Sequence, residues 1–211
     1  MSAAFAQLAR LGSATVYEAS GREGLVDLEL RPLLLGVRAA GPARTVRCGQ
    51  GDNLMVHAVM DRAQPGDVLV LTMPQPEPVA LIGELLATQA KARGVAALLV
   101  DAAVRDVEDL RELGLPIWTR WIRVKGAQKT VAGAIDEPVE VGGATIRPGD
   151  AVVLDVDGVV VVRSERVDEV LAAARERAEQ RANHARRVSG NKEIRHAEAF
   201  MRVLPQVLDE L

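Results

Sequence analysis

Apolar runs alternate with amphipathic stretches through the middle of the chain. Residues 68–72 and 95–100 are short apolar runs bounded by turn-forming residues, as expected of buried strands. Residues 80–93 between them have the pattern of a helix, and Gly94 follows as a favourable C-cap. This strand, helix, strand order predicts a parallel pair of strands joined by a right-handed crossover.

The first sixty residues have a less regular pattern. Residues 2–22 predict two short helices, and residues 51–63 predict a third. Residues 35–46 predict two short strands, because Gly41-Pro42 interrupts the apolar positions as a turn does.

The second half of the chain is richer in strands. A short helix at 106–113 and a strand beginning at 116–119 continue the alternation, and residues 139–146 predict a hairpin. Asp157-Gly158 predicts a second hairpin, because both residues tolerate the positive φ of a tight turn and strand-like runs flank them. Residues 167–187 predict a long charged helix.

The composition is typical of a folded globular protein. The chain has 211 residues, of which 48% are hydrophobic and 26% charged, so it can bury a sizeable core. We expect a single domain over residues 1–188 and a helical tail over residues 189–211. Aromatic residues make up only 2%, which leaves too few rings to stack nucleic-acid bases.

Charge and cysteine content narrow the function classes further. The net charge of −3 and the pI near 5.7 disfavour binding to a phosphate backbone, so we expect no nucleic-acid partner. The single Cys48 excludes an internal disulfide, and no Cys/His cluster has the spacing of zinc ligands. No stretch has the length of a membrane span or the pattern of a signal peptide, so we expect a cytoplasmic protein without membrane contact.

Three charged residues are expected to meet at one edge of the predicted sheet. The helix over 80–93 and the strand after it have similar lengths, so the helix start and the loop after the strand face the same edge. Glu84 should therefore lie near Arg105 and Asp106. This edge, at the carboxyl ends of parallel strands, is where α/β sheets bind ligands.

The groups at this edge have complementary chemistry. Backbone N–H groups at a helix start can bind a carboxylate, and those expected here belong to Gly83, Glu84, Leu85 and Leu86. Arg105 offers a planar fork to a second anionic or enolate oxygen. Asp106 is an oxygen ligand suited to Mg²⁺ or Mn²⁺. Such a site suits a small 2-oxo acid.

Structural interpretations of the same residues remain open. An Arg-Asp pair at a helix start is also a common cap, as Arg105-Asp106 could be, and Glu84 could be an ordinary surface residue. Asp101 could simply end its strand.

Other candidate motifs are less informative. The run from Asp155 to Gly158 resembles the start of a calcium loop, but the downstream glutamate is missing and strands flank it, which favours a hairpin. His57, His184 and His196 lack metal-ligand spacing. No GxSxG, P-loop or GxGxxG motif occurs.

Seven segments in order resemble those of one family. They are TVYEASGR (15–22), GDNLMVH (51–57), PGDVLVL (65–71), GELLATQAKARG (83–94), VDAAVRDV (100–107), PVEVGGATIRPGD (138–150) and DVDGVVVV (155–162). The chain resembles the 4-hydroxy-4-methyl-2-oxoglutarate / 4-carboxy-4-hydroxy-2-oxoadipate aldolase family, which also contains the regulator of ribonuclease E activity A. The signature of that family is an acidic residue, twenty intervening residues and Arg-Asp, and Glu84 with Arg105-Asp106 has this spacing.

The resemblance implies a role for each candidate residue. Asp106 would hold the divalent cation. Arg105 and the backbone of residues 83–86 would bind the pyruvate part of the substrate. Glu84 would position a water that carries protons, together with a glutamate from the C-terminal helix of a neighbouring subunit. Glu179 is the best match for that glutamate, ahead of Glu176, and Lys129 aligns with a basic residue near the family's pocket.

The resemblance also implies an architecture and a reaction. The fold would be an α/β/β/α sandwich with a β-barrel-like core, of the swivelling-domain type, with C-terminal helices, and it would assemble as a trimer or hexamer. The reaction would be metal-dependent cleavage of 4-hydroxy-4-methyl-2-oxoglutarate, or a related 4-hydroxy-2-oxo acid, to pyruvate and a second 2-oxo acid, with oxaloacetate decarboxylation as a side activity. The alternative is a non-catalytic protein-binding module of the ribonuclease-regulator type.

Overall fold

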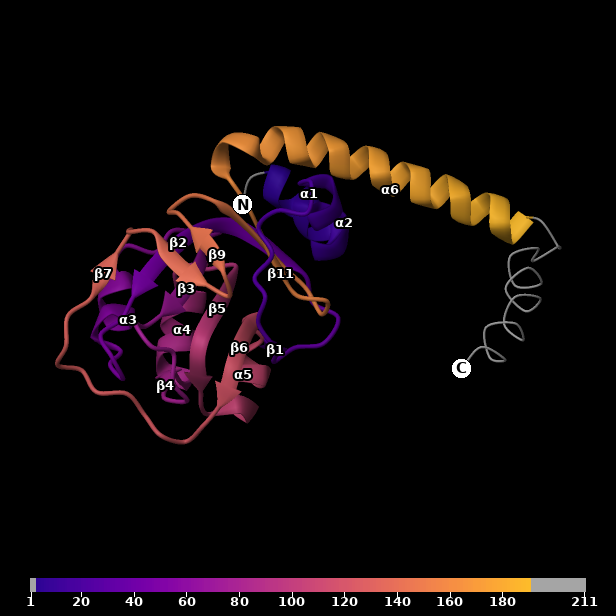
Figure 1. Cartoon of the computed structure of the whole chain (residues 1–211). Coiled ribbons are helices and arrows are strands. Elements are labelled where there is room, and N and C mark those ends of the chain that lie inside the picture. Colours follow the sequence, from indigo (N-terminus) through magenta and orange to yellow (C-terminus); the bar gives the residue numbers. More distant parts are fainter. Residues whose placement is uncertain (1–2, 191–211) are drawn as a thin grey trace, which may run out of the picture. The chain divides into compact units, whose positions relative to one another are not determined.

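The computed structural model describes residues 3–190 (Figure 1). The chain forms two compact units, Met1–Ala174 and Arg175–Leu211. Helix α6, Val167–Gly190, begins in the first unit and ends in the second. The predicted tail lies outside the described residues from position 191 onward. None of the helices in the described range is long and apolar enough to cross a membrane.

Helices and strands alternate in the first half of the chain, and strands dominate the second half. In chain order the elements are α1 (Ala3–Leu11), α2 (Ser13–Ala19), β1 (Arg31–Pro32), β2 (Ala39–Arg47), α3 (Leu54–Val59), β3 (Val68–Thr72), β4 (Ala80–Ile82), α4 (Glu84–Ala92), β5 (Ala97–Val104), α5 (Val107–Leu113), β6 (Ile117–Ile122), β7 (Ala134–Ile135), β8 (Val139–Val141), β9 (Ala144–Ile146), β10 (Ala151–Leu154), β11 (Val159–Val162), the short 3₁₀ helix η1 (Ser164–Arg166) and α6.

Nine strands form one curled sheet, and β8 and β9 form a separate hairpin. The order in the sheet is β1-β6-β5-β3-β2-β10-β11, with β4 beside β5 and β7 beside β2. The strands β2, β3, β5 and β6 are parallel, which confirms the parallel pair predicted around α4. The sheet curls into a half-barrel (Figure 1), which confirms the predicted α/β fold with a barrel-like core.

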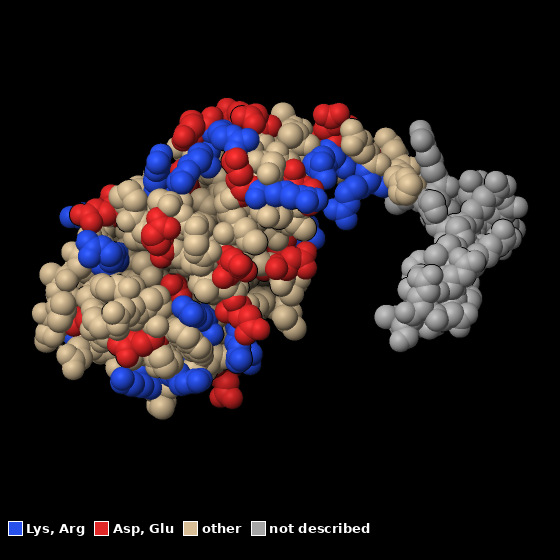
Figure 2. Space-filling view, viewed as in Figure 1, with Lys and Arg blue, Asp and Glu red and all other residues tan. Residues whose placement is uncertain are grey.

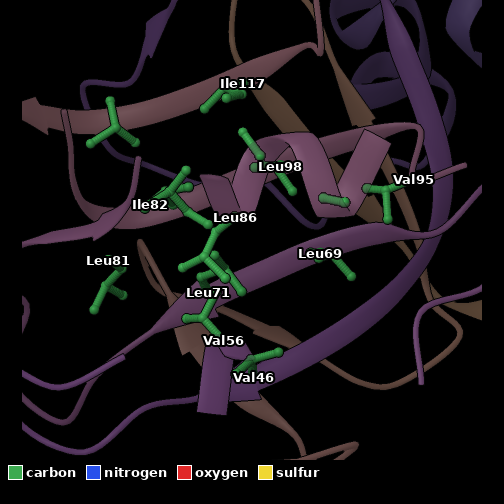
Figure 3. Packing of buried hydrophobic residues seen from close by; sticks show 14 of the residues in the cluster. Val46, Val56, Leu69, Leu71, Leu81, Ile82, Leu86, Val95, Leu98 and Ile117 are labelled. Carbon is green, nitrogen blue, oxygen red and sulfur yellow. The ribbon is translucent and has the colours of Figure 1, made fainter. Parts of the chain in front are cut away.

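The sheet buries apolar side chains on both faces. Val68 and Val70 of β3 lie on the face covered by the β8–β9 hairpin. Leu69 and Leu71 alternate with them and pack on the opposite face, together with Val56 of α3 and Leu86 of α4 (Figure 3). Leu110 of α5 belongs to the same cluster. Each fully buried side chain of this size contributes about 1.5–3 kcal/mol. Burial on both faces explains why the parallel strands are apolar at nearly every position.

Strand β2 continues through Gly41-Pro42, so the turn predicted there is wrong. The first half of β2 pairs with β10, and from Ala43 onward it pairs with β3. A Cβ at Gly41 would lie 2.1 Å from the carbonyl oxygen of Gly66, so the close approach of the two backbones requires glycine. Gly41-Pro42 therefore marks a change of neighbouring strand.

Strand β5 extends to Val104, beyond the predicted end at residue 100. Its last residues pair with β4, which occupies part of the segment predicted as helix, so α4 begins only at Glu84. Asp101 lies inside β5 and is buried, and its Oδ1 accepts a hydrogen bond from Arg120 Nη1 at 3.0 Å. The interpretation of Asp101 as the end of the strand is therefore wrong.

The hairpin predicted at Asp157-Gly158 is confirmed. β10 and β11 pair antiparallel along their whole length. The Asp155 carboxylate accepts hydrogen bonds from the backbone N–H and the hydroxyl of Ser13, at the start of α2. It thus ties the N-terminal helices to the hairpin, which explains the acidic residue without a calcium ion.

Candidate active site

A cavity of about 360 Å³ opens at the carboxyl ends of β4 and β5. Its lining comes from α3, β4, the start of α4, the loop after β5 and the segment between β6 and β7. The six residues predicted at this edge all line it: Gly83, Glu84, Leu85, Leu86, Arg105 and Asp106. The predicted edge is therefore a real concave site.

Helix α4 directs its first turn toward the cavity. The N–H of Glu84 donates to Asp106 Oδ2 at 3.2 Å, so a carboxylate of the protein already occupies this donor. The next two residues, Leu85 and Leu86, belong to the first turn, where N–H groups have no acceptor within the helix. These two donors, together with the positive end of the helix, suit a ligand anion.

Asp106 has a left-handed backbone conformation, with φ of +59°, directly before α5. Aspartate tolerates the left-handed backbone conformation better than most residues, although this conformation still costs about 1 kcal/mol. The Asp106 side chain makes no capping hydrogen bond to α5. Its Oδ2 instead lies 3.6 Å from Arg105 Nε. The capping interpretation therefore does not account for the side chain, which is directed at the first turn of α4 and at Arg105.

Two glycines make room for these charged side chains. A Cβ at Gly83 would lie 2.5 Å from Asp106 Oδ2 and 3.2 Å from Arg105 Nε. A Cβ at Gly126 would lie 2.8 Å from Arg105 Nη1. The Arg105 side chain thus lies against Gly83 and Gly126, two positions that have no side chain of their own. Sequence reasoning missed Gly126, because nothing in the local pattern shows that its segment crosses the cavity.

Lys129 also lines the cavity, from the irregular segment between β6 and β7. Hydrogen bonds attach this segment to the cavity floor: the Ala80 N–H donates to the Lys125 carbonyl at 2.8 Å, and the Asn53 N–H donates to the Gln128 carbonyl at 2.9 Å. Burial lowers the pKa of His57, and the nearby charge of Lys129 lowers it further. Both effects favour the neutral imidazole.

Asn53 supplies a polar atom that the residue pattern gave no reason to expect. Its Nδ2 donates to the Leu81 carbonyl at 3.0 Å, which fixes the orientation of the amide. Its Oδ1 is buried and has no hydrogen-bond partner among the described residues. Leaving such an acceptor unsatisfied costs about 1–3 kcal/mol. Because Asn53 lines the cavity, a hydroxyl group or a water bound there would satisfy it.

The family assignment rests on a match over most of the chain. The family model described as RraA-like, Aldolase/RraA, matches residues 13–161. The chain belongs to this family. A protein of Halalkalibacterium halodurans named "Putative 4-hydroxy-4-methyl-2-oxoglutarate aldolase" is 36% identical over 171 residues, which are 80% of this chain and 81% of that protein. The resemblance noted in the sequence is confirmed.

Solved structures of RraA proteins have the same fold. Streptomyces coelicolor RraAS2, described as an unusual member of the RNase ES inhibitor RraA protein family, is 33% identical with a TM-score of 0.76, over 87% of this chain and 95% of that one. The RNA-processing inhibitor RraA from Thermus thermophilis is 32% identical with a TM-score of 0.59, over 63% of this chain and 80% of that one. By their names, RraA-like relatives include both an aldolase and inhibitors.

The cavity suits an open metal site better than a closed one. Among residues 3–190, no group of three His, Cys, Asp or Glu side chains could enclose a metal ion. Asp106 contributes a single carboxylate, and its side chain is 39% exposed. Mg²⁺ usually binds through one or two carboxylates and keeps several waters or ligand oxygens. The residues present therefore fit Mg²⁺ or Mn²⁺ held by Asp106, and they do not fit a four-ligand structural site.

The two glutamates predicted to act in the site of a neighbouring subunit lie on α6. Glu176 and Glu179 are exposed on α6, in the second compact unit. Glu176 accepts a hydrogen bond from Gln180 at 3.1 Å. The role of Glu179 in the site of a neighbouring subunit stays a prediction.

Proposed function

We propose that the chain is a divalent-metal-dependent lyase that cleaves 4-hydroxy-4-methyl-2-oxoglutarate, or a related 4-hydroxy-2-oxo acid, to pyruvate and a second 2-oxo acid. The observation that carries this proposal is the convergence of the α4 start, Arg105 and Asp106 on one cavity. The name of the 36% identical relative supports the same reaction.

The residues of the cavity have distinct tasks in this reaction. The free N–H groups of Leu85 and Leu86 bind the substrate carboxylate. The Arg105 guanidinium binds the 2-oxo oxygen and stabilises the negative charge that develops there as the bond between C3 and C4 breaks. A divalent cation bound by Asp106 would act as a Lewis acid on the same oxygen.

Proton transfer is assigned to the carboxylates. The C4 hydroxyl must lose its proton as it becomes a carbonyl, and C3 must gain one to give pyruvate. Glu84 lines the cavity and is exposed, so it can orient a water that takes the proton of the C4 hydroxyl and then returns a proton to C3, which balances the two steps. Glu179 of a neighbouring subunit would assist it. Oxaloacetate decarboxylation passes through the same enolate, so the same groups would catalyse it.

The test is an assay of pyruvate release from 4-hydroxy-4-methyl-2-oxoglutarate and from oxaloacetate, with Mg²⁺ or Mn²⁺. Asp106→Asn keeps the shape and the left-handed backbone but weakens the metal ligand, and we expect it to lower kcat/KM at least about 100-fold. Arg105→Lys loses the planar fork and should lower it about tenfold or more. Asp109→Asn, on the exposed face of α5, is the control and should leave the rate unchanged. Full activity in Asp106→Asn would exclude the proposal.

A second candidate is a non-catalytic inhibitor of a ribonuclease. The 33% identity to RraAS2 over nearly its whole length favours it. Acidic and basic side chains are mixed over the viewed face (Figure 2). This face therefore has no large patch of one charge that would indicate where a partner protein binds. Tight binding to a ribonuclease with no metal-dependent pyruvate release would favour this candidate over the lyase.

A further inference from the structure

Asp101 is a buried acidic residue of β5 that the proposed reaction does not use. Its Oδ1 accepts a hydrogen bond from Arg120 Nη1 of β6 at 3.0 Å, and its Oδ2 accepts one from the Thr72 hydroxyl of β3 at 3.4 Å. Burial raises the pKa of the Asp101 carboxyl, and the hydrogen bonds from these two side chains offset this only in part. The ionised carboxylate therefore costs stability at neutral pH, so stability does not explain its place in the strand.

Strand β5 has one residue more than β6 between two points of their pairing. Val100 lies opposite Thr119, whereas Ala103 lies opposite Trp121. Residues 101–102 therefore face a single residue of β6, which is the arrangement of a β-bulge. A bulge shifts all later residues of its strand by one position, about 3.3 Å, and a shift of one position exchanges the two faces to which side chains point.

Side chains join the two strands across this bulge. Arg120 is the single residue of β6 opposite the bulge, so its hydrogen bond to Asp101 connects the two sides directly. The Arg120 guanidinium also lies 4.3 Å from the centroid of the Trp121 ring. The carbonyl oxygen of Ala102, the second bulge residue, accepts a hydrogen bond from the Thr119 hydroxyl at 3.0 Å. These contacts replace those that the interrupted strand pairing lacks.

The bulge is also where β5 changes its neighbour on the side away from β6. Before the bulge β5 pairs with β3, and after it with β4, which ends at Ile82 just before Gly83 and α4. The Arg105 N–H donates to the Ile82 carbonyl at 3.0 Å. Asp106 Oδ2 accepts from the Glu84 N–H at 3.2 Å. The place of Arg105 and Asp106 beside α4 therefore follows from the register of β5 after the bulge.

We infer that Asp101 and Arg120 are positioning residues, whose ion pair holds the bulge so that the loop after β5 meets the start of α4. Neither residue lines the cavity, so the pair acts through Arg105 and Asp106. Bulges are common beside active sites, where they redirect side chains, and the best-attested use of a buried ion pair is to fix one register. The inference rests on the proposed function for the reaction that measures it, and it adds the residues that keep the reacting groups in place.

The first test separates activity from stability. Arg120→Ala leaves the Asp101 carboxylate buried without its partner, so the melting temperature should fall by about 5 °C or more. The double variant Asp101→Ala/Arg120→Ala buries no charge at this place and should recover much of that loss. The kcat/KM for pyruvate release should nevertheless fall about tenfold in Asp101→Ala, in Arg120→Ala and in the double variant alike, because each of them frees the bulge. If the pair were merely structural, activity would return with stability in the double variant.

A conservative variant and a matched control accompany these three. Asp101→Asn keeps an acceptor for Arg120 and should lower kcat/KM by no more than about threefold. Arg163→Ala removes the partner of another buried carboxylate, because Arg163 Nη1 lies 2.7 Å from Asp150 Oδ2 at the end of β11. The side-chain exposures of that pair, 33% and 1%, match the 32% and 4% of Arg120 and Asp101. Arg163→Ala should lower the melting temperature without changing kcat/KM.

The second test needs no assay of activity. The N–H groups of Ala103 and Arg105 join β5 to the end of β4, by hydrogen bonds of 3.0 Å to Val79 and Ile82. Hydrogen exchange of the full chain, followed by mass spectrometry, should be at least about fivefold faster at residues 103–105 in Asp101→Ala and in the double variant. It should be unchanged there in Arg163→Ala.

The outcomes distinguish this inference from the proposed function. Recovered activity in the double variant, unchanged exchange at residues 103–105, or equal losses of activity in Arg163→Ala and Arg120→Ala would each overturn the inference. If Arg120→Ala does not fold, the double variant still shows whether activity returns with stability. If exchange changes as expected but no form of the protein releases pyruvate, the positioning role stands and the lyase proposal fails. If every variant releases pyruvate at the wild-type rate, the lyase proposal stands and the inference fails.

Discussion

The charged groups of the cavity are placed by two residues that have no side chain. Gly83 and Gly126 leave the space that Asp106 Oδ2 and the Arg105 guanidinium occupy. The backbone of Gly83 is extended, with φ of −136°, so any residue could adopt its conformation. Glycine is required here because Asp106 and Arg105 occupy the space beside it. The requirement therefore comes from the site and not from the backbone conformation.

Gly83→Ala should consequently impair binding and catalysis more than stability. The added methyl group would displace Asp106 and Arg105, whose ends are flexible, so the fold can accommodate it. We expect kcat/KM for pyruvate release to fall about tenfold or more, because small displacements of catalytic groups are costly. The melting temperature should change by no more than about 2 °C. Steady-state kinetics and thermal unfolding of the same preparation provide the measurement.

Gly143→Ala provides the opposite control. Gly143 has φ of +76° in the β8–β9 turn, with nothing within 4 Å of its missing Cβ. Alanine there is strained and should cost about 1 kcal/mol of stability, but the cavity should keep its full activity. If Gly83→Ala instead loses stability with unaltered kcat/KM, the glycine serves the fold and the argument from the charged neighbours is wrong.

At the scale of elements, Asp52 connects α3 to the segment between β6 and β7, and this connection depends on pH. Desolvation raises the pKa of the buried carboxyl, but hydrogen bonds from the backbone N–H groups of Thr130, Leu54 and Val131 outweigh it, so the pKa is lowered. The unfolded value is about 3.9. The stabilisation is therefore complete above about pH 4 and is lost as the pH falls through the folded pKa.

Asp52→Asn should lower the free energy of unfolding by about 2 kcal/mol at neutral pH, because the amide cannot accept all of these hydrogen bonds. The difference from the wild type should shrink as the pH is lowered below about 4. Urea unfolding followed by circular dichroism at several pH values measures it. Asp61→Asn, whose side chain is 87% exposed, should change stability by less than about 0.5 kcal/mol throughout. A difference for Asp52→Asn that is constant with pH would contradict this account.

The elements also show what the residue pattern can and cannot predict. The pattern predicted that Glu84 meets Arg105-Asp106, and the structure brings them to one cavity. The similar helix and strand lengths on which this prediction was based are wrong, because α4 has 9 residues and β5 has 8, and a strand rises about twice as far per residue as a helix. The pattern failed at Gly41-Pro42 and at the end of β5, where a strand changes its neighbour. Pairing partners distant in sequence decide such points, and local composition does not record them.

The same limit applies within the site. Gly126 and Lys129 lie on a segment that is neither helix nor strand. The periodicity of hydrophobic residues therefore could not predict that they line the cavity. His57 on α3 lies one helical turn after Asn53, the residue that precedes this helix, and nothing in the local sequence distinguishes a cavity wall from an ordinary helix start. Their position depends on the long-range contacts of Asp52 and of the Leu81 carbonyl.

At the scale of the whole molecule, the residues assigned to the site belong to two compact units. The cavity of the first compact unit contains Arg105 and Asp106, whereas Glu179 lies on α6 in the second unit. The family resemblance implies that this glutamate serves a neighbouring subunit in a trimer or hexamer. In a ring with head-to-tail interfaces, each site would then combine residues of two chains.

This arrangement predicts complementation between two inactive variants. Arg105→Ala and Glu179→Gln should each lose most of the pyruvate-releasing activity when prepared alone. In mixed assemblies formed by co-expression, an Arg105 from one chain and a Glu179 from its neighbour would meet in about a quarter of the sites, which should recover about that fraction of the wild-type rate. Mixing the two purified variants without subunit exchange is the matched control and should recover nothing. If Glu179 instead acts within its own chain, every site in the mixed assembly lacks one of the two groups, and co-expression should give no more activity than the separate variants.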